Sequence, residues 1–64
     1  MENNISKKLI KLRGNRKQKD VAKRLGITTS ALSNYENGLR IPRDEIKIKI
    51  AKFYKKSVEE IFFK

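Results

Sequence analysis

Residues 18–38 read QKDVAKRLGITTSALSNYENG, and this stretch decides the fold of the 64-residue chain. Apolar residues recur in its first part at the spacing of one helical face, which predicts a helix over about 18–25. Gly26 then stands where a left-handed residue can end that helix. Ala22 is small at the point where this helix has to approach the next one closely. The residues of the apolar face are Val21, Ala22 and Leu25.

A second helix is predicted over about 29–36. Thr28 precedes it, where its side chain can accept hydrogen bonds from the free amides of the first turn. Asn37 and Gly38 follow it, and this pair ends the helix. The wedge between the two helices contains Val21, Leu25, Ile27, Leu32 and Tyr35. Two short helices joined by a tight glycine turn over such a wedge are the layout of a helix-turn-helix.

Outside this stretch, the N-terminal segment predicts one more helix. Ile5, Leu9 and Leu12 recur at i, i+4 and i+7, which is the spacing of one helical face. The pair Gly14-Asn15 then ends the pattern, so the helix is expected over about 4–13.

The segment from Glu45 to Ile50 alternates strictly between polar and apolar residues, and by that rule alone it fits a strand. We interpret it as a helix over about 44–54, because Ile46, Ile50 and Phe53 continue at i, i+4 and i+7. Acidic residues at the start favour a helix, and a single strand would have no partner in the chain. Ile48 is the residue that this register places least well.

The last residues predict a short helix and an apolar end. Ser57 and Glu60 have the spacing of a capping box, which would open a helix that carries Val58, Ile61 and Phe62. Ile61, Phe62 and Phe63 together offer more apolar surface than a chain end needs, which indicates a self-association patch. A frayed terminus without function fits the same residues.

Composition limits the function. The chain has no Cys and no His, so we expect no disulfide, no zinc site of the usual ligands, no metal and no cofactor. Its acids are scattered without a paired nucleophile and base, which argues against an enzyme. No apolar run has the length of a membrane span, and the N-terminus lacks the layout of a signal peptide. We therefore expect one all-α cytoplasmic domain, without residues for a separate effector-binding domain.

Charge divides the chain into three parts. The formal net charge of +10 splits into +7 for residues 1–26, −1 for residues 27–39 and +4 for residues 40–64. Basic segments on both sides of a nearly neutral one suit a polyanion that is bound in two ways. Lys and Arg would hold phosphates, while neutral Thr, Ser and Asn would reach base edges. A surface that is merely rich in solvated lysine is the simpler alternative.

Residues 18–38, with Pro42, Ile50-Ala51 and the segment from Ser57 to Phe62, resemble the lambda repressor/Cro-like (XRE-type) DNA-binding domain. The resemblance covers nearly the whole chain. It implies a compact five-helix fold whose third helix lies in the major groove, and a homodimer on a two-fold-related site. It also implies a bacterial or phage-encoded transcription regulator, with repressor as the expected role. No small-molecule effector is evident, because we expect no residues to remain for an effector pocket.

Carried onto this chain, the resemblance places Thr29, Ser30 and Asn34 at positions that face base edges, with Ser33 beside them. Asn can pair with adenine, and Thr or Ser can bond any base. Glu36 is expected to stay within the protein. Gln18 is expected to brace the third helix and contact a phosphate. The further residues expected at phosphates are Lys17, Thr28, Asn37, Arg40 and Arg43, with Arg13 and Arg16 from the corner between the first two helices.

The chain departs from the family pattern at the start of the second helix, among other positions, and a rival function also fits the sequence. The family usually has Thr or Ser where this chain has Lys17, so the side-chain cap of the second helix is expected to be lost. The rival function is a protein-binding module, such as the antitoxin half of a toxin–antitoxin pair. A membrane-active cationic protein fits less well, because the apolar faces are needed for the core.

Overall fold

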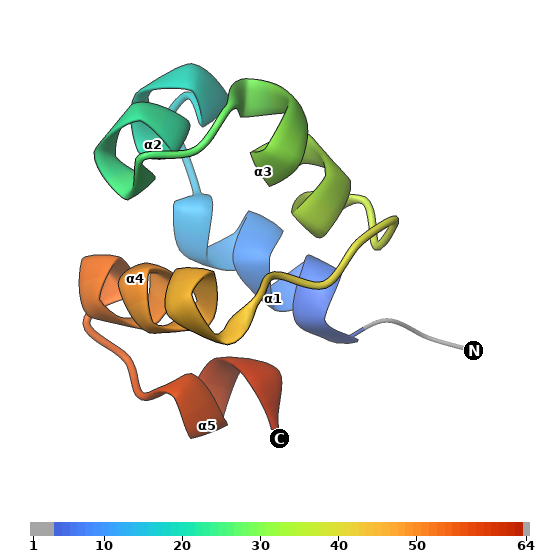
Figure 1. The fold of residues 1–64 in the computed structure, drawn as a ribbon, viewed down its shortest axis with the longest axis vertical. Coiled ribbons are helices and arrows are strands. Elements are labelled where there is room, and N and C mark those ends of the chain that lie inside the picture. Colours follow the sequence, from blue (N-terminus) through green and yellow to red (C-terminus); the bar gives the residue numbers. More distant parts are fainter. Residues whose placement is uncertain (1–3, 64) are drawn as a thin grey trace.

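The computed structural model describes residues 4–63, which form five α-helices and no strand (Figure 1). The helices are α1 (Asn4–Arg13), α2 (Gln18–Leu25), α3 (Thr29–Glu36), α4 (Asp44–Tyr54) and α5 (Val58–Phe62). The predicted all-α, five-helix fold is therefore confirmed. None of the described helices combines the length and the apolar character that a membrane crossing requires.

The helix α1 runs through the middle of the molecule, with α2 and α3 on one side of it and α5 on the other (Figure 1). It packs against α3 and α5, while α2 packs against α3 and α4, and α4 against α5. The α2–α3 pair thus rests on two helices, because α3 packs on α1 and α2 packs on α4. This arrangement fixes the orientation of α3 relative to the rest of the protein.

The core takes residues from all five helices. The inward faces predicted from periodicity supply it, since apolar side chains leave water where the helices meet. Removing that apolar surface from water is the main force that holds so short a chain together. The buried residues are Leu9, Val21, Ala22, Leu25, Leu32, Ile50, Ala51, Ile61 and Phe62, with Ile5, Leu12, Ile27, Tyr35, Ile46, Phe53, Tyr54 and Val58 packed against them.

The alternating segment at the start of α4 is helical, as predicted. Ile46 and Ile50 are four residues apart and lie on the same side, with Ile50 fully buried. Ile48 is offset from both by two residues, about 200° around the helix, and remains 47% exposed. The sequence looks like a strand because an isoleucine, Ile48, also occupies a position on the solvent side of the helix.

Capping follows the sequence signals closely. The Thr28 side chain accepts a hydrogen bond from the amide of Ala31, and Gly26 has the left-handed φ of 72° expected after α2. Ser57 and Glu60 form both bonds of the capping box. Lys17 precedes α2 in extended conformation without a side-chain cap, so the expected loss is confirmed. Lys55 ends α4 with a positive φ of 58°, a conformation that the sequence did not indicate.

The predicted terminal patch needs correction. Ile61 and Phe62 are 2% and 7% exposed, because α5 turns them into the core. Of the three residues, Phe63 alone is exposed, at 67%. The Lys47 ammonium of α4 lies 5.2 Å from the centre of the Phe63 ring and 5.5 Å from that of Phe62, close enough for a cation–π interaction.

Candidate nucleic-acid interface

One side of α3 is polar, uncharged and accessible. Thr29 and Ser30 in its first turn are exposed, and Ser33 and Asn34 one turn later are half-buried. These residues share one stripe because side chains three and four positions apart lie on one helix face. The buried residues of α3 are Leu32 and Glu36. The four residues predicted to face DNA bases are therefore brought together on one accessible face.

The end of α3 is anchored by a buried carboxylate. Glu36 is 2% exposed, and its Oε2 accepts a hydrogen bond from Arg13 Nε at 2.8 Å. Its Oε1 accepts a second bond from Gln18 Nε2, also at 2.8 Å. The carboxylate thus ties α3 to the last residue of α1 and the first residue of α2. The prediction that Glu36 bonds within the protein is confirmed, as is the bracing part of the prediction for Gln18.

Arg13 acts inside the protein. Besides its bond to Glu36, its Nη1 donates to the backbone oxygen of Arg16 at 2.7 Å, and the side chain is 20% exposed. A buried carboxylate needs such a partner, because an unpaired charge in the interior is strongly destabilising. The structure therefore gives Arg13 an anchoring role that the sequence did not indicate, since the two partners are 23 residues apart.

Tyr54 of α4 lies at the same anchor. Its hydroxyl is buried without a hydrogen-bond partner among the described residues. Burial raises the pKa of this hydroxyl above its ordinary value of 10.0, and the Glu36 carboxylate raises it further. The guanidinium groups of Arg16 and Arg13 act in the opposite direction. No local pattern around Tyr54 indicates this position, which only the packing of α4 creates.

Polar groups at the two ends of α3 keep donors for a phosphate. Thr28 Oγ1 accepts the capping bond from Ala31 and still has its own O–H to donate. Asn37 Nδ2 donates to Ser33 Oγ at 3.1 Å, which uses one of its two N–H groups. A phosphate oxygen only accepts, so both residues can bind one while their intramolecular bonds persist.

Exposed cations precede α2 and follow α3 in the chain. Lys17 lies directly before α2, and Arg40 and Arg43 lie in the connection from α3 to α4. Arg43 lines one surface hollow of about 370 Å³ together with Thr28, so the structure brings these two predicted contacts to the same place. The connection itself is fixed at its start, because the amides of Leu39 and Arg40 both donate to the Asn34 carbonyl.

Arg16, also expected near a phosphate, lies over aromatic rings. Its guanidinium carbon is 5.7 Å from the centre of the Phe53 ring and 5.9 Å from that of Tyr54, and its Nη1 donates to the Leu12 carbonyl. Nothing in the chain order indicated this stacking between the α1–α2 corner and α4. Within the described part of the chain, no three His, Cys, Asp or Glu residues gather as a metal site would require.

Comparison with known proteins agrees with this geometry. A family model described as helix-turn-helix matches residues 7–61, which include α2, α3 and most of the remaining fold. No curated protein and no solved structure matches the chain. The match covers most of the sequence, and the structure supplies the expected helices in the expected order. The chain therefore belongs to the lambda repressor/XRE-like helix-turn-helix family of DNA-binding transcription regulators.

Proposed function

We propose that this protein is a sequence-specific regulator that binds double-stranded DNA, inserts α3 into the major groove and represses transcription by occupying its operator. The observation that carries the proposal is the exposed, uncharged face of α3 on a helix whose far end is locked by Glu36. Base readout requires neutral donors and acceptors at base edges and a helix held in one orientation. Both requirements are met in the same element.

We assign the proposed DNA contacts to two sets of residues, one for base edges and one for phosphates. Thr29, Ser30, Ser33 and Asn34 read base edges from the accessible face of α3. The phosphate set is Lys17, Gln18, Thr28, Asn37, Arg40 and Arg43. Arg13 leaves this set in our proposal, because its guanidinium is held by Glu36 and the Arg16 carbonyl. Gln18 keeps a place in it through the second N–H of its amide.

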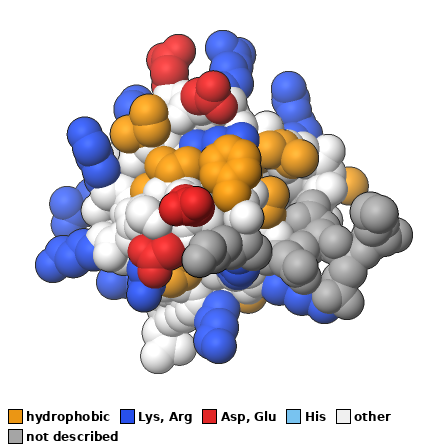
Figure 2. Space-filling view, turned by 90° about the horizontal axis from the view of Figure 1, so that it is seen from below, with side chains coloured by type: hydrophobic (Ala, Val, Ile, Leu, Met, Phe, Trp, Pro, Cys, Tyr) orange, Lys and Arg blue, Asp and Glu red, His pale blue; other side chains and the backbone are white. Residues whose placement is uncertain are grey.

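We further propose that the protein acts as a homodimer on a two-fold-related site. Hydrophobic side chains gather on the underside of the molecule, where α5 lies (Figures 1 and 2). The exposed Phe63 directly follows α5, and Ile48 on α4 is also exposed. Burying such residues against a second copy would remove apolar surface from water and place two α3 helices on one duplex.

The test is selection of bound DNA from a random pool, followed by binding measurements at several salt concentrations. We expect one enriched motif with two related half-sites, and an affinity for it well above that for unrelated duplexes at every salt concentration. Enrichment of no motif, with equal affinity for all duplexes, would refute sequence-specific binding. If the protein instead copurified in a tight complex with another protein, the antitoxin-type function would replace this proposal.

A further inference from the structure

A second basic surface lies between α2 and α4. It is a groove of about 460 Å³, here called the α2–α4 groove, and its walls come from the end of α2 and the second half of α4. Its lining residues are Lys23, Arg24, Leu25, Gly26, Lys49, Lys52 and Phe53. None of the residues proposed to read bases is among them. Four of the seven carry a positive charge.

The four cations of the groove form no ion pair within the described part of the chain. No acidic residue lines the groove. The end of α2 offers only a partial negative charge of about half a unit, so it offsets a small part of the total. Positive charges that line one groove repel one another and destabilise the folded state, and a bound anion relieves this repulsion.

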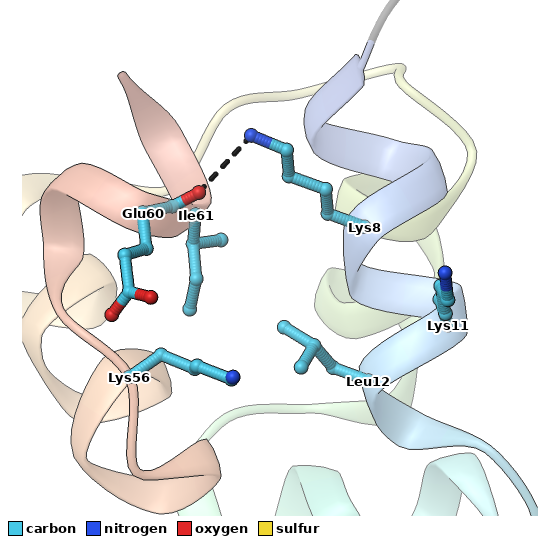
Figure 3. A pocket seen from close by; sticks show the side chains of 6 residues that line it. All are labelled: Lys8, Lys11, Leu12, Lys56, Glu60 and Ile61. Carbon is cyan, nitrogen blue, oxygen red and sulfur yellow. Dashed lines mark hydrogen bonds between the residues drawn. The ribbon is translucent and has the colours of Figure 1, made fainter. Parts of the chain in front are cut away.

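The hollow between α1 and α5 differs from the α2–α4 groove in the contacts that its lysines make (Figure 3). It too contains lysines, but Lys8 Nζ donates to the Glu60 carbonyl at 3.0 Å across the hollow, and the Glu60 residue itself belongs to its lining. The Lys11 ammonium points away from this hollow (Figure 3). In that hollow a lysine therefore has a hydrogen-bond acceptor within the protein. The cations of the α2–α4 groove have no acidic residue in the lining and can bind an external anion.

We propose that the α2–α4 groove binds the phosphate backbone of a second DNA duplex while α3 reads the first. The inference rests on the proposed function in one respect, namely that α3 holds the first duplex. In Figure 1 α3 lies beside α2 and α4 lies below it, so the groove and the accessible face of α3 are on different sides of α2. The protein therefore links two duplexes, one by sequence and one by charge.

The salt dependence of the second contact follows from the number of cations. Each phosphate neutralised by Lys or Arg contributes about 0.9 to the slope of log K against log salt. Four contacts give a slope of about −3.6, so raising salt from about 50 to about 200 mM weakens the second contact roughly 150-fold. With two contacts removed, the same change in salt weakens it only about 12-fold.

The experiment is a two-duplex capture assay. A duplex with the selected site is immobilised and saturated with protein, and a fluorescent duplex of unrelated sequence is added. We expect the wild-type protein to retain the fluorescent duplex at about 50 mM salt. The double variant Lys49→Gln/Lys52→Gln should retain at least about tenfold less, with unchanged binding to the immobilised duplex and the shallower salt dependence of two contacts.

The matched control is Lys11→Gln/Lys56→Gln, which removes the same number of charges from residues that line the hollow of Figure 3 and should leave capture unchanged. Circular dichroism melting confirms that both variants fold. Equal capture by the two variants would overturn the groove as a site. Failure of the wild-type protein to capture the second duplex would overturn the inference as well.

The two proposals fail in different ways. If the immobilised site is preferred over unrelated DNA but no second duplex is captured, the proposed function stands and the groove inference fails. If a second duplex is captured but no site is preferred, the groove stands and sequence-specific reading fails. Should the groove variant instead weaken binding to one long duplex while the wild type captures no second one, the groove contacts flanking DNA and the inference is wrong.

Discussion

At the scale of single residues, Asn34 tests the reading face most directly. Its backbone carbonyl fixes the α3–α4 connection, whereas its side chain is available to a base. Asn34→Ala keeps the carbonyl, so the fold should persist. We expect a loss of roughly 1–3 kcal/mol on the preferred site and relaxed preference at one base position, measured by binding to a series of single-base site variants. If Asn34→Ala kept the base preference of the wild type, the Asn34 side chain would not contact a base.

The control for Asn34 is Arg40→Ala, which removes a proposed phosphate contact. Phosphates carry no sequence information, so this variant should weaken binding to all duplexes alike. Its slope of log K against log salt should fall by about 0.9 for each protomer bound. A change of base preference in Arg40→Ala would contradict the division into reading and backbone residues.

Glu36 is the residue on which the anchor depends. In Glu36→Ala, the Arg13 guanidinium and the Gln18 amide lose their partner, and the charge of Arg13 remains mostly buried. We expect a loss of about 3–5 kcal/mol in the free energy of unfolding, measured by urea denaturation. Since a small domain has only about 5–15 kcal/mol in total, the variant should melt far below the wild type. The exposed Glu59→Ala is the control, and a similar loss in both would refute the anchor.

Tyr54 provides a pH-dependent test. The folded state holds the hydroxyl proton more tightly than the unfolded state, because burial and then Glu36 raise its pKa above 10.0. Deprotonation therefore favours unfolding. This contribution to stability is complete below the unfolded pKa and is lost as pH rises through the folded one. The stability of the wild type should fall relative to that of Tyr54→Phe, which lacks the group, as pH rises above about 10.

At about pH 7, Tyr54→Phe should be as stable as the wild type or about 1 kcal/mol more stable, because it removes a buried hydroxyl without a protein partner. Denaturant unfolding of the two proteins across this pH range measures both effects. All other ionisable groups are common to both proteins, so their effects cancel in the difference. Parallel curves at all pH values would show that Tyr54 does not titrate differently in the two states.

At the scale of elements, much of the fold is predictable because its signals are local. The caps at Thr28 and Ser57 and the left-handed Gly26 act within a few residues, so the helix bounds follow from neighbouring positions. The contacts of Glu36 and Tyr54 join distant segments and depend on how helices pack, which periodicity does not specify. Lys55 takes a left-handed conformation because the turn into α5 requires it, although no glycine marks the position.

The start of α2 combines stability and binding in one residue. Lys17 has the extended conformation of an N-cap, but its side chain makes no capping bond. Lys17→Ser should supply that bond and raise the free energy of unfolding by about 1 kcal/mol. It should also remove a phosphate contact, lowering the salt slope by about 0.9 per protomer. Urea denaturation and DNA titration of the same variant measure the two effects, and lower stability would contradict the capping argument.

For the whole molecule, the net charge of +10 acts on folding and on binding in opposite ways. Repulsion among the cations destabilises the compact free protein, and salt relieves it by screening. The same cations attract DNA, and salt weakens that attraction through counterion release. A polyanion bound on two faces would satisfy charges that the seven acids of the chain leave unpaired. The excess charge is thus coupled to the proposed function more closely than to the fold.

The salt slope of the specific complex tests the assembly as a whole. Each protomer offers three proposed cationic phosphate contacts, namely Lys17, Arg40 and Arg43, so a dimer offers six and its slope should be about −5. A monomer should give about −3, and a dimer in which Arg13 also left Glu36 for DNA about −7. A short duplex at low concentration restricts the measurement to the α3 face. Because these values differ by two units, titration between about 50 and 200 mM salt separates them, and a slope near −3 would refute the dimer.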